Sequence, residues 1–269
     1  GKVHLSDTFD ARFGVRFGRF TIDDFHGKHR ILSVPEIYKY SSNIGTIHVM
    51  QALGKDNFRD FMTKIGFDQV VPFELPEMRM PKVPAKFSDI VAATASFGHG
   101  ISISPLHMAR AYAGFVNNGV MVPMTLMKRT PEEAAKLGQQ IISPETSREI
   151  RSLMRLNALE GSGTRMNMYA NGYRVGGKTG TAEKVIKGRY ATGTNLNVFA
   201  SGFPLDKPEY VMVIVVDEPK RESPTTGTTA GWNAGEVTGR IVARVAPMLG
   251  ISPDFSQVLD DELVPPSIR

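Results

Sequence analysis

Gly176-Gly177-Lys178-Thr179-Gly180-Thr181 places one cation, two hydroxyl groups and bare glycine backbone side by side. A cation flanked by hydroxyls on a strand without bulky side chains is a good receptor for the carboxylate that ends an extended peptide. The glycines let the backbone of such a ligand approach closely. The stretch therefore predicts a strand whose edge binds a peptide end.

Three runs around this stretch have the character of strands. They are Tyr173 to Val185, Asn197 to Phe203 and Tyr210 to Val216, and short turns separate them. Short connections favour antiparallel pairing, because parallel neighbours need a crossover of a dozen or more residues. The pattern predicts three antiparallel strands.

Helix signals surround these strands. Ser33-Val34-Pro35-Glu36 is a capping box with an early proline, and its helix is expected to run into Ser41-Ser42-Asn43. Two more helices are expected to open with a Ser-Pro pair, Ser104-Pro105 to Val116 and Ser143-Pro144 to Leu159. Asp56 to Ile65 and Asn233 to Pro247 are also expected to be helical, because their apolar residues recur at helical spacing. Helices packed over an antiparallel sheet make an α+β fold.

Two segments lack such signals. Pro72, Pro76, Pro81 and Pro84 space out a stretch that cannot be helical, and a loop of this length is often functional. Residues after about Ile251 have the pattern of a tail.

The glycine-lysine stretch also admits a nucleotide-binding interpretation. Gly172 to Thr179 fits G-x-x-x-x-G-K-[ST], and Val211 to Glu218 is an apolar run that ends in acids. A phosphate loop needs a buried strand before it and a helix after it. Glu160 to Asn167 is polar and broken by glycine, and Thr181 to Gly188 is too short for a crossover helix. The residues on both sides of the stretch therefore favour a strand over a phosphate loop.

Composition narrows the class. The chain has 269 residues, 41% hydrophobic and 22% charged, which is typical of one globular domain. It contains no cysteine, which excludes disulfides and thiol catalysis. The net charge is +5, but the basic residues are scattered without a run of five, so nucleic acid is not an expected partner. No stretch of 18 apolar residues occurs.

Three histidines suggest a metal site as an alternative. His26-Gly27-Lys28-His29 and His99 have no nearby cysteine or obvious third ligand, so solvated loops are favoured over a zinc site and no cofactor is expected. Trp232 lies in a glycine- and threonine-rich loop, where a structural anchor and a partner contact remain open.

Three stretches together resemble the transpeptidase domain of class B penicillin-binding proteins. They are Tyr40-Ser41-Ser42-Asn43-Ile44-Gly45 with an S-x-N motif, Gly98 to Leu106, and Gly177-Lys178-Thr179-Gly180-Thr181-Ala182 with a K-T-G motif. Thr228 to Ala234 and Phe20 to Gly27 are most similar to the division-specific, penicillin-binding protein 3 type of Gram-negative bacteria. The motifs occur in family order over nearly the whole chain.

The resemblance implies a penicillin-binding-protein/β-lactamase-like transpeptidase fold, with an antiparallel sheet covered by helices, over residues 1–269. The family's acylated serine belongs to an S-x-x-K motif, and no serine of this chain has lysine three positions later. We therefore expect the N-terminal part of the domain to be missing, with only three of the family's five strands remaining. The upstream segment would then carry the nucleophile.

The resemblance also implies roles for individual residues. Lys178 would attract the terminal carboxylate of a peptidoglycan stem peptide ending in D-Ala-D-Ala, and Thr179, Gly180 and Thr181 would bind the same end. The N–H of Thr181 would form half of an oxyanion hole. Ser41 would relay a proton to the leaving group, and Asn43 would hold the substrate amide. For Ser41 and Asn43 the structural alternative is a helix C-terminus, where a polar pair caps carbonyl groups.

The implied activity is D,D-transpeptidation during septal cell-wall synthesis, with acylation by β-lactam antibiotics. Further partners would be a membrane glycan polymerase and division proteins. The implied location is the periplasmic face of the bacterial inner membrane, with an anchor outside this chain. The alternative to an enzyme is a module that binds D-Ala-D-Ala peptides or β-lactams without turnover.

Overall fold

The computed structural model describes residues 1–186 and 189–269. Its contacts divide the chain into two units. Apart from single residues near the C-terminus, the first unit holds Gly1–Ala111 and Val120–Ile141, and the second holds Tyr112–Gly119 and Ile142–Ser267.

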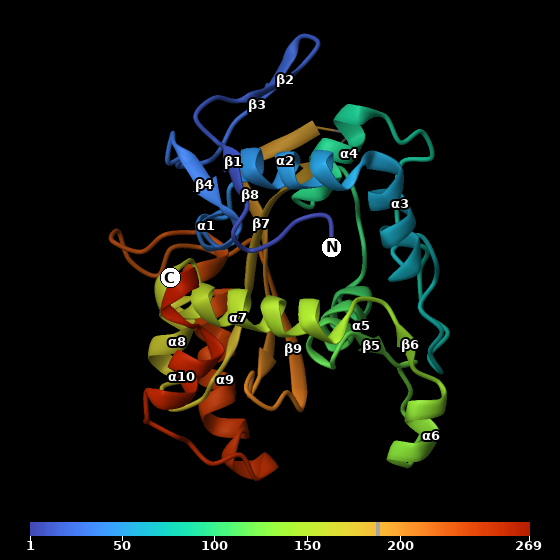
Figure 1. Ribbon diagram of the computed structural model, residues 1–269, viewed down its shortest axis with the longest axis vertical. Coiled ribbons are helices and arrows are strands. Elements are labelled where there is room, and N and C mark those ends of the chain that lie inside the picture. Colours follow the sequence, from blue (N-terminus) through green and yellow to red (C-terminus); the bar gives the residue numbers. More distant parts are fainter. Residues whose placement is uncertain (187–188) are drawn as a thin grey trace. The chain divides into compact units, whose positions relative to one another are not determined.

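The second unit contains the main sheet (Figure 1). Its strands are β7 (Gly176–Ile186), β8 (Arg189–Phe203) and β9 (Tyr210–Asp217). They pair antiparallel in the order β7-β8-β9, with Lys178 opposite Ala200 and Phe199 opposite Ile214. The three antiparallel strands predicted from the sequence are confirmed, although the first begins at Gly176 rather than Tyr173.

Helices supply the rest of the second unit's core. They are α7 (Pro144–Glu160), α8 (Thr164–Tyr169), α9 (Ala234–Val245) and α10 (Val258–Leu263), with the 3₁₀ turns η1 (Ala230–Trp232), η2 (Pro247–Leu249) and η3 (Pro266–Ile268). Phe199 and Phe203 of β8 are almost fully buried against Met166 of α8 and Val242 of α9. Burying each phenylalanine contributes about 1.5–3 kcal/mol. One face of the sheet is thus covered by helices.

The first unit is built from small ribbons and helices. β1 (Thr8–Asp10) pairs with β4 (Ile31–Ser33), β2 (Val15–Phe17) with β3 (Phe20–Ile22), and β5 (Val120–Met121) with β6 (Gln139–Gln140). The helices are α1 (Val34–Tyr40), α2 (Asn43–Leu53), α3 (Lys55–Lys64), α4 (Asp89–Ser96), α5 (Pro105–Val116) and α6 (Pro131–Lys136). The last residues of α5 belong to the second unit. Ile47 of α2, Met62 of α3 and Ala92 of α4 share a core.

The predicted helix starts are confirmed. Ser33 caps α1 in a capping box with Glu36, and Ser143 caps α7 by accepting the N–H of Thr146. The proline-spaced segment before Ser88 contains no helix, as expected. Its backbone is held at Lys82, whose N–H and C=O groups form two hydrogen bonds with the backbone of Ser102.

Two predictions need correction. The first helix stops at Tyr40, because Ser41 adopts a left-handed conformation (φ 56°, ψ 45°), and Ile44 belongs to α2, which the sequence pattern did not predict. The residues after Ile251 are not a tail, because α10 is held by an ion pair between Asp260 and the buried Arg155. That pairing joins residues 105 positions apart, which local periodicity cannot reveal.

Candidate active site

The K-T-G residues lie on β7, an edge strand of the sheet as described for residues 1–186 and 189–269. The carbonyl of Gly177 accepts a hydrogen bond from Asn157 rather than from β8, so it points to the open edge. Backbone groups of an antiparallel strand alternate in direction every residue. The N–H and C=O groups of Thr179 and Thr181 therefore face that same edge, where an extended peptide could pair with them.

Lys178 is half-buried on this strand. Burial lowers the pKa of its ammonium group from the ordinary 10.5 to about 8, because a charged amine loses hydration there. Its Nζ lies 3.4 Å from the carbonyl oxygen of Thr179. At neutral pH the group is still mostly protonated, and its partly desolvated charge attracts an anion more strongly than a fully hydrated lysine would.

Thr179 belongs to a hydroxyl pair. Its Oγ1 lies 2.7 Å from the Oγ of Ser162, a residue in the turn between α7 and α8. Ser162 in turn donates its N–H and hydroxyl to the Oδ1 of Asn157, at 3.0 and 3.1 Å. Asn157 is fully buried in α7 and donates from Nδ2 to Gly177 at 2.8 Å. These contacts fix the start of β7 to the end of α7.

Thr181 anchors a loop on the other side of the motif. Its Oγ1 accepts the N–H of Ala230 at 3.0 Å. Buried Asn197 of β8 supports the same loop by donating to the carbonyl of Thr228 and to Oδ1 of Asn233. The hydroxyls of Thr179 and Thr181 are thus placed by two separate loops.

Trp232 ends the η1 turn of this loop and is 41% exposed. The guanidinium of Arg165 lies 4.8 Å from its ring centroid, and Arg165 is itself paired with Glu236. A methyl group added at Gly227 would lie 2.5 Å from the ring. These contacts make the indole a structural anchor of the loop.

The glycines of the motif have different roles. A Cβ at Gly176 would lie 2.4 Å from Leu205 and 2.6 Å from the backbone of Met154, and one at Gly177 would lie 2.1 Å from the carbonyl oxygen of Ala200. Both glycines are therefore required by packing within the unit. At Gly180 the nearest atom would be 3.9 Å away, and the residue is exposed. Only Gly180 leaves bare backbone open to a ligand.

The S-x-N residues lie in the first unit, at the junction of α1 and α2. Ser41 is exposed, with a positive φ that is uncommon for a residue with a side chain. Asn43 opens α2 and donates from Nδ2 to the carbonyl of Asp23 at 3.3 Å. The middle residue, Ser42, caps the start of α2, because its Oγ accepts the N–H of Gly45. Ser41 ends α1, because its backbone N–H donates to the carbonyls of Ile37 and Tyr38, so the structural alternative describes this motif residue as well.

Asp24 holds this junction in place. Its carboxylate accepts the hydroxyl of Ser42 at 2.7 Å and the N–H of Ile44 at 3.0 Å. A carboxylate at a helix N-terminus is favoured by the helix dipole and by N–H groups that have no partner within the helix. Gly45 then lets α1 and α2 approach, since a Cβ there would lie 2.5 Å from Ile37.

The structure excludes the phosphate-loop alternative for Gly172 to Thr179. Glu160 to Asn167 holds the end of α7 and part of α8 instead of a buried strand, and Lys178 and Thr179 lie inside a continuous strand instead of opening a helix. Asp217, one of the acids that end the run from Val211 to Glu218, pairs with Lys184 at 2.9 Å. Among the described residues from Gly172 to Ile186 no helix begins, so no helix N-terminus holds a phosphate there.

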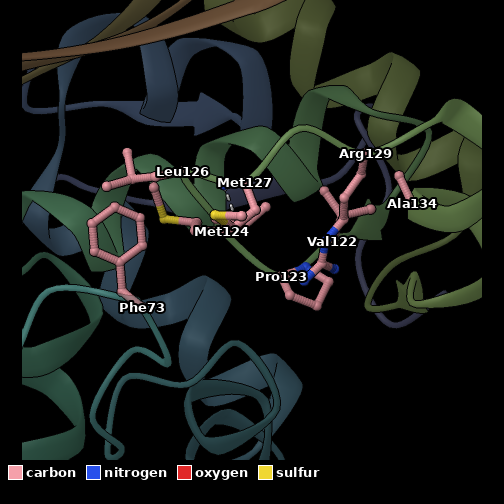
Figure 2. A pocket seen from close by; sticks show the side chains of 9 residues that line it. Phe73, Val122, Pro123, Met124, Leu126, Met127, Arg129 and Ala134 are labelled. Carbon is pink, nitrogen blue, oxygen red and sulfur yellow. Dashed lines mark hydrogen bonds between the residues drawn. The ribbon is translucent and has the colours of Figure 1, made fainter.

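Other features of the described residues do not add to the candidate site. The first unit has a pocket of about 460 Å³ lined by Phe73, Met124, Leu126, Met127 and neighbours, but by none of the predicted site residues (Figure 2). Within the described residues no cluster of three metal-ligating side chains occurs. In the same part of the chain, no helix has both the length and the apolar character needed to cross a membrane.

Sequence reasoning missed Ser162, Asn157 and Asp24. Asn157 did carry a signal, because it is a polar residue four positions after Leu153 on the apolar face of its helix. The other two contact residues 17 or 18 positions away, and no local pattern marks such contacts.

Comparison with known proteins gives the same family as the motifs. Residues 2–243 match the model of the penicillin binding protein transpeptidase domain. A probable peptidoglycan D,D-transpeptidase FtsI of Caulobacter vibrioides is 36% identical over 93% of this chain and 44% of its own length. A probable peptidoglycan D,D-transpeptidase PenA of Neisseria flavescens is 29% identical over 94% of this chain and 61% of its own length.

Solved structures agree. The transpeptidase domain of penicillin-binding protein 3 from Burkholderia pseudomallei superposes with a TM-score of 0.85 and 27% identity, covering 95% of this chain and 76% of that one. The chain belongs to the penicillin-binding protein transpeptidase domain family, and its relatives are of the FtsI and penicillin-binding protein 3 type. The predicted family and fold are confirmed. The chain spans about half the length of the two curated relatives.

Proposed function

We propose that residues 1–269 form the transpeptidase domain of a peptidoglycan D,D-transpeptidase that cross-links stem peptides during septal cell-wall synthesis. The observation that carries this proposal is Lys178, a partly desolvated cation on an edge strand, next to Thr179, exposed Gly180 and Thr181. The names of the relatives, which are probable peptidoglycan D,D-transpeptidases, support the same activity.

In this proposal the β7 edge binds the D-Ala-D-Ala end of the stem peptide. The ammonium of Lys178 and the hydroxyls of Thr179 and Thr181 bind the terminal carboxylate, because charge-assisted hydrogen bonds are about twice as strong as neutral ones. Gly180 allows the peptide backbone to lie against the strand. The N–H of Thr181 faces the open edge and donates to the oxyanion that forms on the attacked carbonyl.

Ser41 and Asn43 are proposed to act on the same reaction from the α1–α2 junction. A serine oxygen attacks the carbonyl between the two D-alanines, the C–N bond breaks, and the released D-Ala takes a proton that Ser41 relays. Asn43 holds the substrate amide. The acyl group then passes to an amine of a neighbouring strand. The attacking serine is proposed to lie outside these residues, since none of them forms S-x-x-K.

β-Lactams are proposed to acylate the same serine, because their ring amide and carboxylate occupy the positions of the peptide bond and the terminal carboxylate. The proposed location is the periplasmic face of the inner membrane. A membrane glycan polymerase and division proteins are the proposed partners.

The test is an intact-mass measurement on the full-length gene product with benzylpenicillin. We expect a gain of one drug mass, and we expect Lys178→Ala to slow acylation about 10- to 100-fold, which corresponds to the loss of a charged hydrogen bond. Lys184→Ala is the matched control, because Lys184 lies on the same strand but pairs with Asp217 and Glu218. A reversible complex without an adduct would favour the binding-module alternative. Equal rates for both variants would exclude the proposed role of Lys178.

A further inference from the structure

The Ser162–Thr179 hydroxyl pair lies at the proposed carboxylate site, and Ser162 belongs to none of the motifs. Ser162 is exposed in the turn after α7, and its Oγ lies 2.7 Å from the Oγ1 of Thr179. This is the ordinary length of a strong O–H···O hydrogen bond. One hydroxyl of the pair donates to the other, so the direction of the donated proton decides what Thr179 can offer a ligand.

Buried Asn157 fixes the position of Ser162. Its Nδ2 donates to the carbonyl of Gly177 at 2.8 Å, and its Oδ1 accepts the backbone N–H of Ser162 at 3.0 Å. A carbonyl can only accept and a backbone N–H can only donate, so the orientation of the amide is determined. Ser162 is therefore held by its own backbone, whatever its hydroxyl does.

The Ser162 hydroxyl has two acceptors within reach, Oδ1 of Asn157 at 3.1 Å and Oγ1 of Thr179 at 2.7 Å. If the proton turns to Thr179, Asn157 still keeps the N–H of Ser162 as its donor, so no buried group loses its only partner. Thr179 then accepts from Ser162, so its own hydroxyl proton is free to point toward another acceptor. A carboxylate, which only accepts, is the complementary group.

We propose that Ser162 is a positioning residue that turns Thr179 into a hydrogen-bond donor toward the carboxylate of the bound peptide or β-lactam. This inference rests on the proposed function, in which Thr179 binds that carboxylate. Hydroxyls in series polarise one another, so the bond from Thr179 to the carboxylate strengthens when Ser162 donates to Thr179. Ser162 itself does not touch the ligand.

The experiment compares two ligands on the full-length gene product: benzylpenicillin, which carries the carboxylate, and its methyl ester, which does not. We expect Ser162→Ala to slow acylation by benzylpenicillin about 3- to 10-fold, corresponding to the loss of one hydrogen bond, and to change the rate with the ester less than about 2-fold. Ser162→Thr keeps the hydroxyl and is expected to restore the benzylpenicillin rate. In a Thr179→Val background, Ser162→Ala is expected to have no further effect.

Ser152→Ala is the matched control, because Ser152 lies in the same unit and donates only within α7, to the carbonyl of Arg148. Equal slowing with both ligands would show a merely structural role and overturn the inference. So would an undiminished effect of Ser162→Ala in the Thr179→Val background. If Thr179→Val slows acylation but Ser162→Ala does not, this inference alone fails. If the unmodified protein forms no adduct, the proposed function fails and this inference falls with it.

Discussion

At Gly177 an added methyl group would lie 2.1 Å from the carbonyl oxygen of Ala200, whereas at Gly180 its nearest neighbour would be 3.9 Å away. We expect Gly177→Ala to lower the free energy of unfolding by about 1–3 kcal/mol, because the two strands must separate to admit it. Gly180→Ala should change it by less than about 0.5 kcal/mol. Denaturant unfolding of both variants measures the difference. Equal losses would contradict the separate roles given to these glycines.

A second residue-scale prediction concerns Lys178. Its pKa of about 8 in the folded protein is below its ordinary 10.5, because burial disfavours the charged form. Between these values the unfolded chain holds a proton that the native protein has released, so this lysine makes stability rise with pH. Relative to Lys178→Met, the wild type should therefore gain stability from pH 8 to pH 10.5.

The control for this pH dependence is Lys184→Met. Hydrogen bonds to Glu218 and Asp217 raise the pKa of Lys184 above its ordinary 10.5, so its contribution has the opposite sign and is lost only above about pH 10.5. Unfolding midpoints of the three proteins across this range give the comparison. Parallel pH profiles for wild type and Lys178→Met would rule out a depressed pKa.

The sequence predicted the motif residues of the site but not those that position them. Lys178, Thr179 and Thr181 are adjacent in the chain, so one strand necessarily brings them together. Ser162 and Asn157 reach the motif only through the turn after α7, and their contacts depend on how that helix packs on β7. Tertiary contacts of this kind leave little trace in a single sequence.

At the scale of elements, α10 shows what local patterns miss. The side chain of Arg155 in α7 is only 5% exposed, and Asp260 in α10 binds it through two hydrogen bonds of 2.7 and 2.8 Å. Arg155 also donates to the carbonyl of Val175, just before β7. One ion pair thus joins the C-terminal helix to the strand of the candidate site.

Removing Asp260 should leave the charge of Arg155 buried without compensation. We expect Asp260→Ala to cost about 3–5 kcal/mol of unfolding free energy. Asp261→Ala is the control, since Asp261 is 56% exposed in its pair with Arg269 and should cost less than about 1 kcal/mol. Chemical denaturation of both variants provides the measurement. Similar small losses would mean that α10 is a dispensable tail after all.

At the scale of the whole molecule, the helices that open with a serine cap or a proline and the three strands of the main sheet were predictable, because caps, prolines and short turns act locally. The short ribbons of the first unit were not predicted, since strands of two or three residues are too short to show a period. The division of the contacts into two units has no local sequence signal either. The order of helices before and after one antiparallel sheet was enough to give the α+β class.

The strands of the two units differ in how many neighbours they pair with, and this difference predicts a difference in local stability. β8 is paired along both edges, and Phe199 and Ser201 within it are fully buried, so its amides can exchange only when the sheet opens. β5 and β6 are two residues each and pair only with one another among the described residues. Native-state hydrogen exchange should therefore be slowest at Asn197 to Phe203 and fast in the β5–β6 ribbon. If the ribbon were protected as strongly as β8, stability would not be concentrated in the sheet that carries Lys178.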